Sequence, residues 1–160
     1  MRNNLQTEKT KIKGGNVGKN CILCQVIRGE LPSYKVYEDE KIVGILDINP
    51  ITKGHCLIIP KQHRVWFTDL VSGEAGPFFK AVWTVSKQLK KAFNAQYVTL
   101  LIRGTRIPHL HAHLVPSIKG ELSATDRILD LLQYVQENQK SVVKPSEFKR
   151  IAKLIRATNP

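Results

Sequence analysis

Five short segments of the chain are rich in Val, Ile and Leu and are bounded by turn-forming residues. They cover residues 34–38, 41–48, 55–59, 97–103 and 108–116. Asn49-Pro50, Lys53-Gly54 and Gly104 fall between them, and such residues favour turns over strands. Each segment has the length and the β-branched content of a strand, so the pattern predicts five strands.

The segment from Ser72 to Asn94 has a helical pattern instead. Its apolar side chains recur every three or four residues and share one face; they are Phe78, Val82, Val85, Leu89 and Phe93. Pro77 is expected in the first turn, where a missing backbone N–H does no harm. The pattern predicts one long helix with a single buried face.

Shorter helices are expected at both ends of the chain. Residues 21–28 can form a helical turn, and two apolar stripes after Lys119-Gly120 predict two more helices. The stripes comprise Ile128, Leu131, Leu132 and Val135, and then Phe148, Ile151, Leu154 and Ile155. Hairpin-like strands with segregated helices indicate an α+β fold.

Length and composition fit one soluble domain. The chain has 160 residues, of which 42% are hydrophobic and 24% charged, so it can bury a core without disulfides. We expect three parts: a flexible basic tail over residues 1–20, a folded domain over 21–118, and a helical extension over 119–160.

The chain carries a formal net charge of +12. Such a charge attracts polyanions, among them nucleotides, nucleic acid and anionic lipid, but does not choose between them. No apolar run is long enough to span a bilayer, and the N-terminus has no secretory signal. We therefore expect a cytoplasmic protein with reduced thiols and no membrane partner.

Three of the five histidines alternate along the last predicted strand, in the string H-L-H-A-H-L-V-P. Side chains two apart on a strand share a face, so His109, His111 and His113 should lie roughly 7 Å apart on one surface. Three interpretations remain open: a polar surface strand, a metal site, or a row of imidazoles that supplies a nucleophile and donors to a phosphoryl group.

Cys21 and Cys24 form a C-x-x-C motif that has two interpretations. A redox pair needs a lowered thiol pKa and usually a βαβ context, which this pattern does not show. A zinc half-site needs two further ligands, for which His63 and His109 are the remaining candidates. Cys56 is expected to be a small buried residue.

With these motifs the sequence resembles the histidine triad (HIT) family of nucleotide hydrolases and transferases. The match includes the triad and the stretch K-V-Y-E-D-E-K-I-V-G-I-L-D-I-N-P-I-T-K-G-H-C-L-I-I-P-K-Q-H, and it covers about residues 21–118. The resemblance implies a five-stranded antiparallel sheet with one long helix and a homodimer. It also implies cleavage at the α-phosphate of a nucleotide conjugate.

The resemblance implies roles for individual residues. His111 would attack phosphorus and form a nucleotidyl-histidine, while His113 and His55 would bind phosphate oxygens. The leaving group would take its proton from His113 or from a water. Asp47 would accept hydrogen bonds from the ribose hydroxyls. The base would lie among the aliphatic residues Leu23, Val26, Ile45 and Ile48.

The resemblance also implies one structural zinc ion per chain. In many bacterial-type members a C-x-x-C motif, the P-K-x-H histidine and the first triad histidine bind it together. The matching residues here are Cys21, Cys24, His63 and His109. Zinc would tie the N-terminal segment to the catalytic strand and orient His111 through its neighbour.

Two positions depart from the family pattern. The loop before the triad is short, and the usual Asn and Gln that contact phosphate are missing from it. Arg103, Thr105 and Arg106 stand in this loop and are the candidates to replace them, because guanidinium binds phosphate well. Ser117 stands where an Arg is common.

Three functions are compatible with these observations. The first is a hydrolase or transferase of small nucleotide conjugates, such as phosphoramidates or dinucleoside polyphosphates. The second is a repair enzyme that removes AMP from DNA 5′ ends, which makes nucleic acid a possible partner. The third is a non-catalytic nucleotide-binding protein, against which the intact triad and Asp47 argue.

Overall fold

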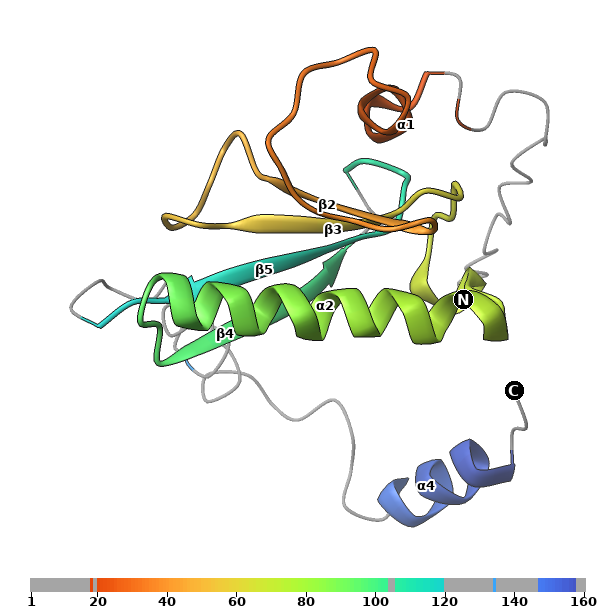
Figure 1. Ribbon diagram of the computed structural model, residues 1–160. Helices are drawn as coiled ribbons and strands as arrows, with labels where there is room; N and C mark the ends of the chain where they lie inside the picture. Colours follow the sequence, from red (N-terminus) through yellow and green to blue (C-terminus); the bar gives the residue numbers. More distant parts are fainter. Residues whose placement is uncertain (1–17, 19, 104–105, 120–133, 135–146, 158–160) are drawn as a thin grey trace. The chain divides into compact units, whose positions relative to one another are not determined.

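The computed structural model describes residues 18, 20–103, 106–119, 134 and 147–157 (Figure 1). Its elements in chain order are α1 (Ile22–Ile27), β1 (Lys35–Glu38), β2 (Ile42–Leu46), β3 (Cys56–Pro60), a 3₁₀ turn (Phe67–Asp69), α2 (Ser72–Ala92), β4 (Tyr97–Arg103), β5 (His111–Ser117) and α4 (Phe148–Ala157).

The five strands form one antiparallel sheet in the order β1-β2-β3-β5-β4. This confirms the predicted α+β architecture with a five-stranded antiparallel sheet and one long helix. β4 has the predicted bounds, and β1, β2 and β3 lie within one or two residues of theirs. Local patterns of β-branched residues and turns therefore suffice to find most of the sheet.

The two faces of the sheet bury two separate hydrophobic clusters. On one face, α2 packs against Ile42, Ile58 and Leu114. On the other, α1 packs against a second cluster that includes Val43 and Ile59. Figure 1 shows α1 and α2 on opposite sides of the sheet. Each strand in the middle of the sheet is therefore buried on both faces, which explains its continuous apolar character.

The start of β5 corrects the prediction. A strand from Pro108 is expected, but β5 begins at His111. The backbone N–H of Leu110 donates to the carbonyl of Arg64 at 2.5 Å, and that of His109 donates to the carbonyl of Ile107 at 2.7 Å. These bonds hold residues 109 and 110 away from the strand ladder. The first triad histidine therefore lies before the strand, and only the second and third lie on it.

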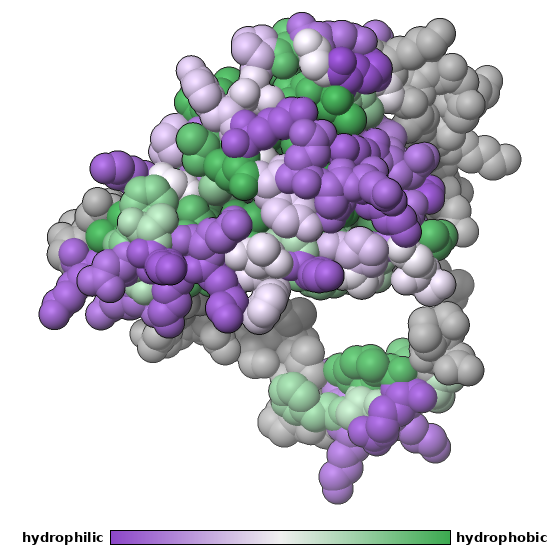
Figure 2. All heavy atoms as spheres, viewed as in Figure 1, coloured by the Kyte–Doolittle hydropathy of each residue, from purple (hydrophilic) through white to green (hydrophobic). Residues whose placement is uncertain are grey.

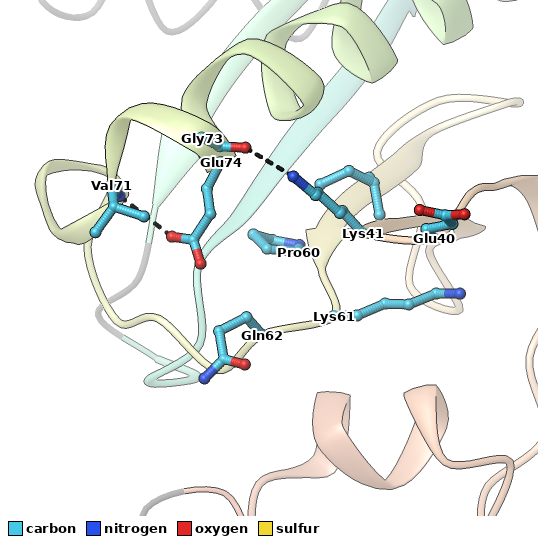
Figure 3. Close-up of a pocket in the computed structure, with 9 residues that line it drawn as sticks. Glu40, Lys41, Pro60, Lys61, Gln62, Val71, Gly73 and Glu74 are labelled. Carbon is cyan, nitrogen blue, oxygen red and sulfur yellow. Dashed lines mark hydrogen bonds between the residues drawn. The ribbon is translucent and has the colours of Figure 1, made fainter.

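Pro77 is the sixth residue of α2, so its expected place in the first turn is wrong. A proline there leaves the carbonyl of Gly73, four residues earlier, without its helical donor. The Nζ of Lys41 donates to that carbonyl at 3.1 Å, as Figure 3 shows. Glu74, in the first turn of α2, accepts a hydrogen bond from the Val71 N–H at 3.2 Å. The side chain of Lys41, which immediately precedes β2, thus replaces the missing intrahelical bond.

The chain divides into two units, residues 1–121 and 122–160. The sheet, α1 and α2 belong to the first unit, and α4 belongs to the second. The expected tail over residues 1–20 lies almost wholly outside the described residues, as does the predicted helix around 128–135. Among the described helices, none is both long and apolar enough to cross a bilayer.

Candidate functional site

Four polar residues lie on the face of the sheet that α1 covers, because they continue the alternation of side chains along the strands. They are Asp47, His55, His111 and His113. Asp47 follows β2 and His55 precedes β3, and the N–H of Asp47 donates to the carbonyl of His55 at 2.9 Å. His111 and His113 lie on β5, where His113 is paired with Leu57 of β3. Directly opposed residues share a face, so the polar groups meet at one end of the sheet.

His111 has a fixed tautomer. Its ring is only 5% exposed, and its Nδ1 lies 2.6 Å from the backbone carbonyl of His109. A carbonyl only accepts, so Nδ1 carries the proton and donates it. In the neutral ring the lone pair is then on Nε2, at the opposite edge of the imidazole.

His55 and His113 form a second histidine pair. The N–H of Ile51 donates to His55 Nδ1 at 3.2 Å, so the proton of the neutral ring is on Nε2. That Nε2 lies 3.0 Å from His113 Nδ1 and donates to it. Burial lowers the pKa of His55, and the nearby Asp47 carboxylate opposes this in part. The chain of bonds keeps both rings oriented and assigns the His113 proton to its own Nε2.

Asp47 is held at the mouth of this site. Its Oδ1 accepts the backbone N–H of Asn49 at 2.8 Å. Its Oδ2 lies 3.6 Å from His55 Nδ1, and its side chain is 16% exposed. One oxygen is thus used by the turn, as expected of an aspartate before Asn-Pro. The other lies beside the histidines.

A cavity of ≈ 500 Å³ opens over these residues. Seven predicted site residues line it: Leu23, Val26, Ile45, Asp47, Ile48, His111 and His113. Ile48 is 75% exposed and stands at the rim. Such a cavity, apolar with a few converging polar groups, is typical of small-molecule sites.

The other predicted residues are placed less directly. His55 is not among the lining residues, but its Nε2 lies 3.0 Å from the Nδ1 of His113, which does line the cavity. The Cα of Arg103 is paired with that of His111 across β4 and β5, but its side chain is outside the described part of the chain. Thr105 also lies outside the described residues.

Sequence reasoning missed several wall residues, among them Leu31, Pro32 and Ile107. Leu31 and Pro32 belong to a turn that the chain makes after α1. Ile107 lies two residues before the first triad histidine, in the shortened loop. The signal available in the sequence was an apolar residue close to the histidine motif that is expected to bind phosphate.

A second group of residues meets at the other end of the sheet. The ligand atoms of Cys21, Cys24, His63 and His109 all lie within 4.8 Å of one another. Cys21 Sγ and Cys24 Sγ lie 3.5 and 3.4 Å from His109 Nδ1, and Cys24 Sγ lies 3.2 Å from His63 Nδ1. The structure thus brings together all four predicted metal ligands.

The spacing of this cluster fits a tetrahedral ion. Zinc bonds of about 2.3 Å to sulfur and 2.0 Å to nitrogen separate the two ligand atoms by roughly 3.5 Å. His109 Nε2 donates to the Pro60 carbonyl at 2.9 Å, which leaves Nδ1 available as a ligand. His63 is hydrogen-bonded to the backbone of Pro108. Such bonds to the second ring nitrogen are usual for metal-binding histidines.

The protonation of the cluster without metal supports the same interpretation. Burial, and then the neighbouring Cys21, raise the pKa of Cys24 to about 11. Burial lowers the pKa of His109 to about 4. A redox cysteine needs a lowered pKa, so the redox interpretation of the C-x-x-C motif is not supported. A bound metal ion would favour the Cys24 thiolate that burial disfavours.

Cys56 is a core residue, as expected. It is 0% exposed, and burial raises the pKa of its thiol to about 11. It packs in the cluster between the sheet and α2. All three cysteines are free thiols.

A further hollow of ≈ 460 Å³ lies at the start of β2 and the end of β3 (Figure 3). Three of its charged lining residues, Lys41, Lys61 and Glu74, already have polar partners. Lys61 contacts Glu38 at 2.9 Å, and Glu74 accepts two bonds from Arg64. These contacts brace the start of α2.

Comparison with known proteins gives consistent matches. The HIT domain family matches residues 28–120. An uncharacterized HIT-like protein of Methanocaldococcus jannaschii is 37% identical over 63% of this chain and 81% of its own length. An adenylylsulfatase of Arabidopsis thaliana is 33% identical over 66% of this chain and 56% of its own. An adenosine 5′-monophosphoramidase of Saccharomyces cerevisiae is 34% identical over 60% of this chain and 61% of its own length.

Solved structures share the fold. A member of the HIT family from Bacillus subtilis superposes with a TM-score of 0.70, at 27% identity, over 88% of this chain and 98% of its own. A Zn-bound histidine triad family protein from Mycobacterium smegmatis gives a TM-score of 0.61 at 30% identity. The match covers 65% of this chain and 79% of that protein's chain.

Proposed function

Because the chain belongs to the histidine triad (HIT) family, we propose that it cleaves nucleotide conjugates at the α-phosphate through a covalent intermediate on His111. The single observation that carries this proposal is the bond from His111 Nδ1–H to the His109 carbonyl at 2.6 Å. It leaves Nε2 of the neutral ring with its lone pair, as a nucleophile requires.

The proposed reaction has two displacements at phosphorus. His111 Nε2 attacks the α-phosphorus, and the bond from phosphorus to the leaving group breaks, which gives a nucleotidyl-histidine. Water then attacks the same phosphorus, the P–N bond to His111 breaks, and the nucleoside monophosphate leaves. The leaving group takes one proton in the first step, and the attacking water gives up one in the second.

The bonding of His55 and His113 supports a role as donors to phosphate. With the Ile51 N–H fixing His55, and His55 donating to His113 Nδ1, the proton of neutral His113 is on Nε2. Such an N–H neutralises charge that develops on a phosphate oxygen. It can also protonate the leaving group, a step for which water is the other source.

The cavity supports recognition of a nucleoside. We propose that Asp47 accepts hydrogen bonds from the ribose hydroxyls, since a carboxylate is the stronger acceptor there. Leu23, Val26, Ile45 and Ile48 would contact the base through aliphatic surface. Arg103 and Thr105 remain the proposed phosphate contacts from the shortened loop. Aliphatic contacts discriminate poorly between bases, so we expect weak base preference.

We propose zinc as the ion for the cysteine–histidine cluster. Cys21, Cys24, His63 and His109 would hold it with two sulfur and two nitrogen ligands, a set that suits zinc. The Zn-bound relative from Mycobacterium smegmatis supports the choice. A bound ion would fix the N-terminal segment and the backbone of His109, whose carbonyl orients His111.

The protein is also proposed to form a homodimer in the cytoplasm. β4 is one edge of the sheet, and its Leu100 and Leu101 are 43% and 47% exposed. Exposed apolar side chains on an edge strand favour pairing with a second copy. Light scattering of the purified chain should give the mass of a dimer, and Leu101→Lys should lower it to that of a monomer.

A panel of substrates tests the proposed function. The wild type is incubated with adenosine 5′-phosphoramidate, adenylyl sulfate, a diadenosine polyphosphate and DNA with a 5′ adenylate. His111→Asn serves as the matched variant, because Asn retains an N–H near the Nδ1 position and lacks the nucleophile. We expect AMP release from at least one small substrate by the wild type and a loss of at least about a thousandfold in the variant.

The other outcomes are distinct. Turnover of adenylated DNA alone would indicate the repair function instead. Binding of AMP without turnover of any substrate would indicate a non-catalytic nucleotide-binding protein. Either result contradicts the proposal.

A further inference from the structure

Helix α4 separates charge from apolar surface along its whole length. Its ten residues, FKRIAKLIRA, contain four bases and no acid. At about 100° per residue, the apolar side chains other than that of the last residue, Ala157, cover an arc of roughly 160°, and the basic ones cover a separate arc of roughly 120° in which Ala157 also falls. The apolar arc holds Phe148, Ile151, Ala152, Leu154 and Ile155, and the basic arc holds Lys149, Arg150, Lys153 and Arg156.

Large apolar side chains of this arc are exposed. Phe148 is 58% exposed and Ile155 is 68% exposed. Figure 2 shows hydrophobic atoms gathered along one side of the segment labelled α4 in Figure 1, and hydrophilic atoms along the other. Of the basic side chains, Arg150 contacts Glu147 at 3.4 Å, a pair in which Arg150 is 73% exposed.

We propose that α4 is an interfacial helix that attaches the protein reversibly to a membrane surface rich in anionic phospholipid. A short helix with a basic face and a Phe/Leu/Ile face is the form that lies in the plane of such an interface. The apolar arc enters the acyl boundary, and the lysine and arginine stems extend to the headgroups. The site is independent of the nucleotide chemistry proposed for the first unit.

Charge distinguishes lipid from the other possible occupants. Residues 21–118 hold twelve bases and seven acids, so the long-range field of the chain's own first unit, or of a second copy, repels the basic helix rather than attracting it. A nucleic acid backbone matches the basic arc but has no use for the apolar one. An anionic bilayer surface supplies a negative plane and an apolar layer in the order that α4 requires.

The expected absence of a membrane partner rests on the lack of a long apolar run. An interfacial helix needs no such run, since its apolar residues are distributed around the helix rather than along the chain. Half of the bases in residues 119–160 fall within α4, and none of the acids of that segment do.

Vesicle flotation of the full chain tests the proposal. Vesicles of phosphatidylcholine alone are compared with vesicles in which phosphatidylserine is roughly a third of the lipid. We expect at least about tenfold more bound protein on the anionic vesicles, with a decrease at high salt. Equal binding to both, or none to either, would overturn the proposal.

Three double variants separate the contributions. Lys149→Glu with Lys153→Glu reverses charge on α4, and Lys90→Glu with Lys91→Glu makes the same change in net charge on exposed positions of α2. The α4 variant should lose about tenfold or more in vesicle binding, and the α2 control less than about threefold. Equal losses in the two would show a general charge effect and contradict a site on α4.

The apolar arc is tested without changing charge. Phe148→Gln with Ile155→Gln should also lose about tenfold in binding to anionic vesicles. Unchanged binding would show that no apolar side chain enters the bilayer, which overturns the interfacial assignment. If this variant instead abolishes a lipid-independent association seen by light scattering, the arc binds a second copy and the proposal fails. Thermal unfolding checks that all variants remain folded.

Discussion

At the scale of single residues, two backbone groups determine how the histidines can act. The His109 carbonyl holds the proton of His111 on Nδ1, and the Ile51 N–H holds that of His55 on Nε2. Neither partner is a catalytic side chain. Side chains that are positioned by the main chain keep their orientation when substrate enters or leaves, which is the property that a phosphoryl-transfer site needs.

Substitution of Asp47 tests recognition of the ribose. Asp47→Asn retains an acceptor for the Asn49 N–H but removes the negative charge from the cavity. Hydrogen bonds to a charged group are the stronger ones, so we expect KM to rise roughly tenfold or more, with a smaller change in kcat.

Asp39→Asn is the matched control for this variant. Asp39 also accepts backbone N–H groups in a turn, from Lys41 and Ile42, and it does not line the cavity. Steady-state kinetics on the best substrate should show little change in the control. A fall in kcat at constant KM in Asp47→Asn would contradict the ribose role.

Gly54 is required by the turn that precedes His55. Its φ is +87°, and a Cβ built there would collide with the ring of Phe93. We expect Gly54→Ala to lower the free energy of unfolding by at least about 2 kcal/mol. Gly76→Ala, in α2 with open space around the added methyl, should raise it by about 1 kcal/mol. Urea denaturation measures both, and similar effects of the two changes would contradict the account.

At the scale of elements, α2 tolerates a proline because another element supplies a donor. Lys41→Met should cost about 1 kcal/mol in the wild type, since the Gly73 carbonyl loses its partner. In Pro77→Ala the restored backbone N–H can bond to that carbonyl, and the cost of Lys41→Met should fall close to zero. Urea denaturation of both single variants and the double variant gives the coupling, and full additivity would exclude it.

The elements also show how far local sequence patterns reach. The bounds of most of α2 follow from periodicity because the helix buries a regular apolar face, and those of β4 follow from its run of β-branched and aliphatic residues between turn signals. The early end of the predicted strand before His111 could not be found this way, since it depends on a bond from Leu110 to Arg64, far away in the chain. The position of Pro77 in α2 could not be predicted for a similar reason. The donor that replaces its missing N–H is the side chain of Lys41, which lies just before β2.

The candidate site was predictable to a comparable extent. Alternation along β5 predicts that His111 and His113 share a face, whereas the places of Asp47 and His55 in the site followed from the resemblance. The metal cluster followed from resemblance and not from spacing. The bond between His55 and His113 was not predictable, because it depends on the separation of β3 and β5 and on the rotamers of both rings.

At the scale of the whole molecule, the cysteine–histidine cluster joins α1 to the loops before β5 and after β3. Its members come from residues 21–24, 63 and 109, so it closes long stretches of chain. His109 links the cluster to His111, because its ring belongs to the cluster and its carbonyl orients His111. Loss of the proposed zinc ion should therefore reduce both the stability and the proposed activity.

The stability of the metal-free protein should depend on pH in a defined direction. The pKa of His109 is about 4 in the folded chain and about 6.5 in the unfolded chain. Between these values the unfolded chain binds a proton that the folded chain does not, so the free energy of unfolding falls as the pH falls through this window. We expect a loss of about 3 kcal/mol, to which the lowered pKa of His55 adds.

Denaturation with a chelator present, from neutral pH to about pH 4, measures this dependence. His109→Gln retains a donor for the Pro60 carbonyl and removes the titrating group, so its profile should be shallower. A wild-type profile that is flat over this range, or that rises as the pH falls, would contradict the account.

The most direct test of the central claim is to identify the atom that carries the nucleotide during turnover. The protein is mixed with adenosine 5′-phosphoramidate, quenched at alkaline pH to preserve a P–N bond, and digested for mass spectrometry. We predict one added AMP moiety per modified chain, located on His111, with none in His111→Asn. An AMP moiety on any other residue, or full turnover by His111→Asn, would contradict the account.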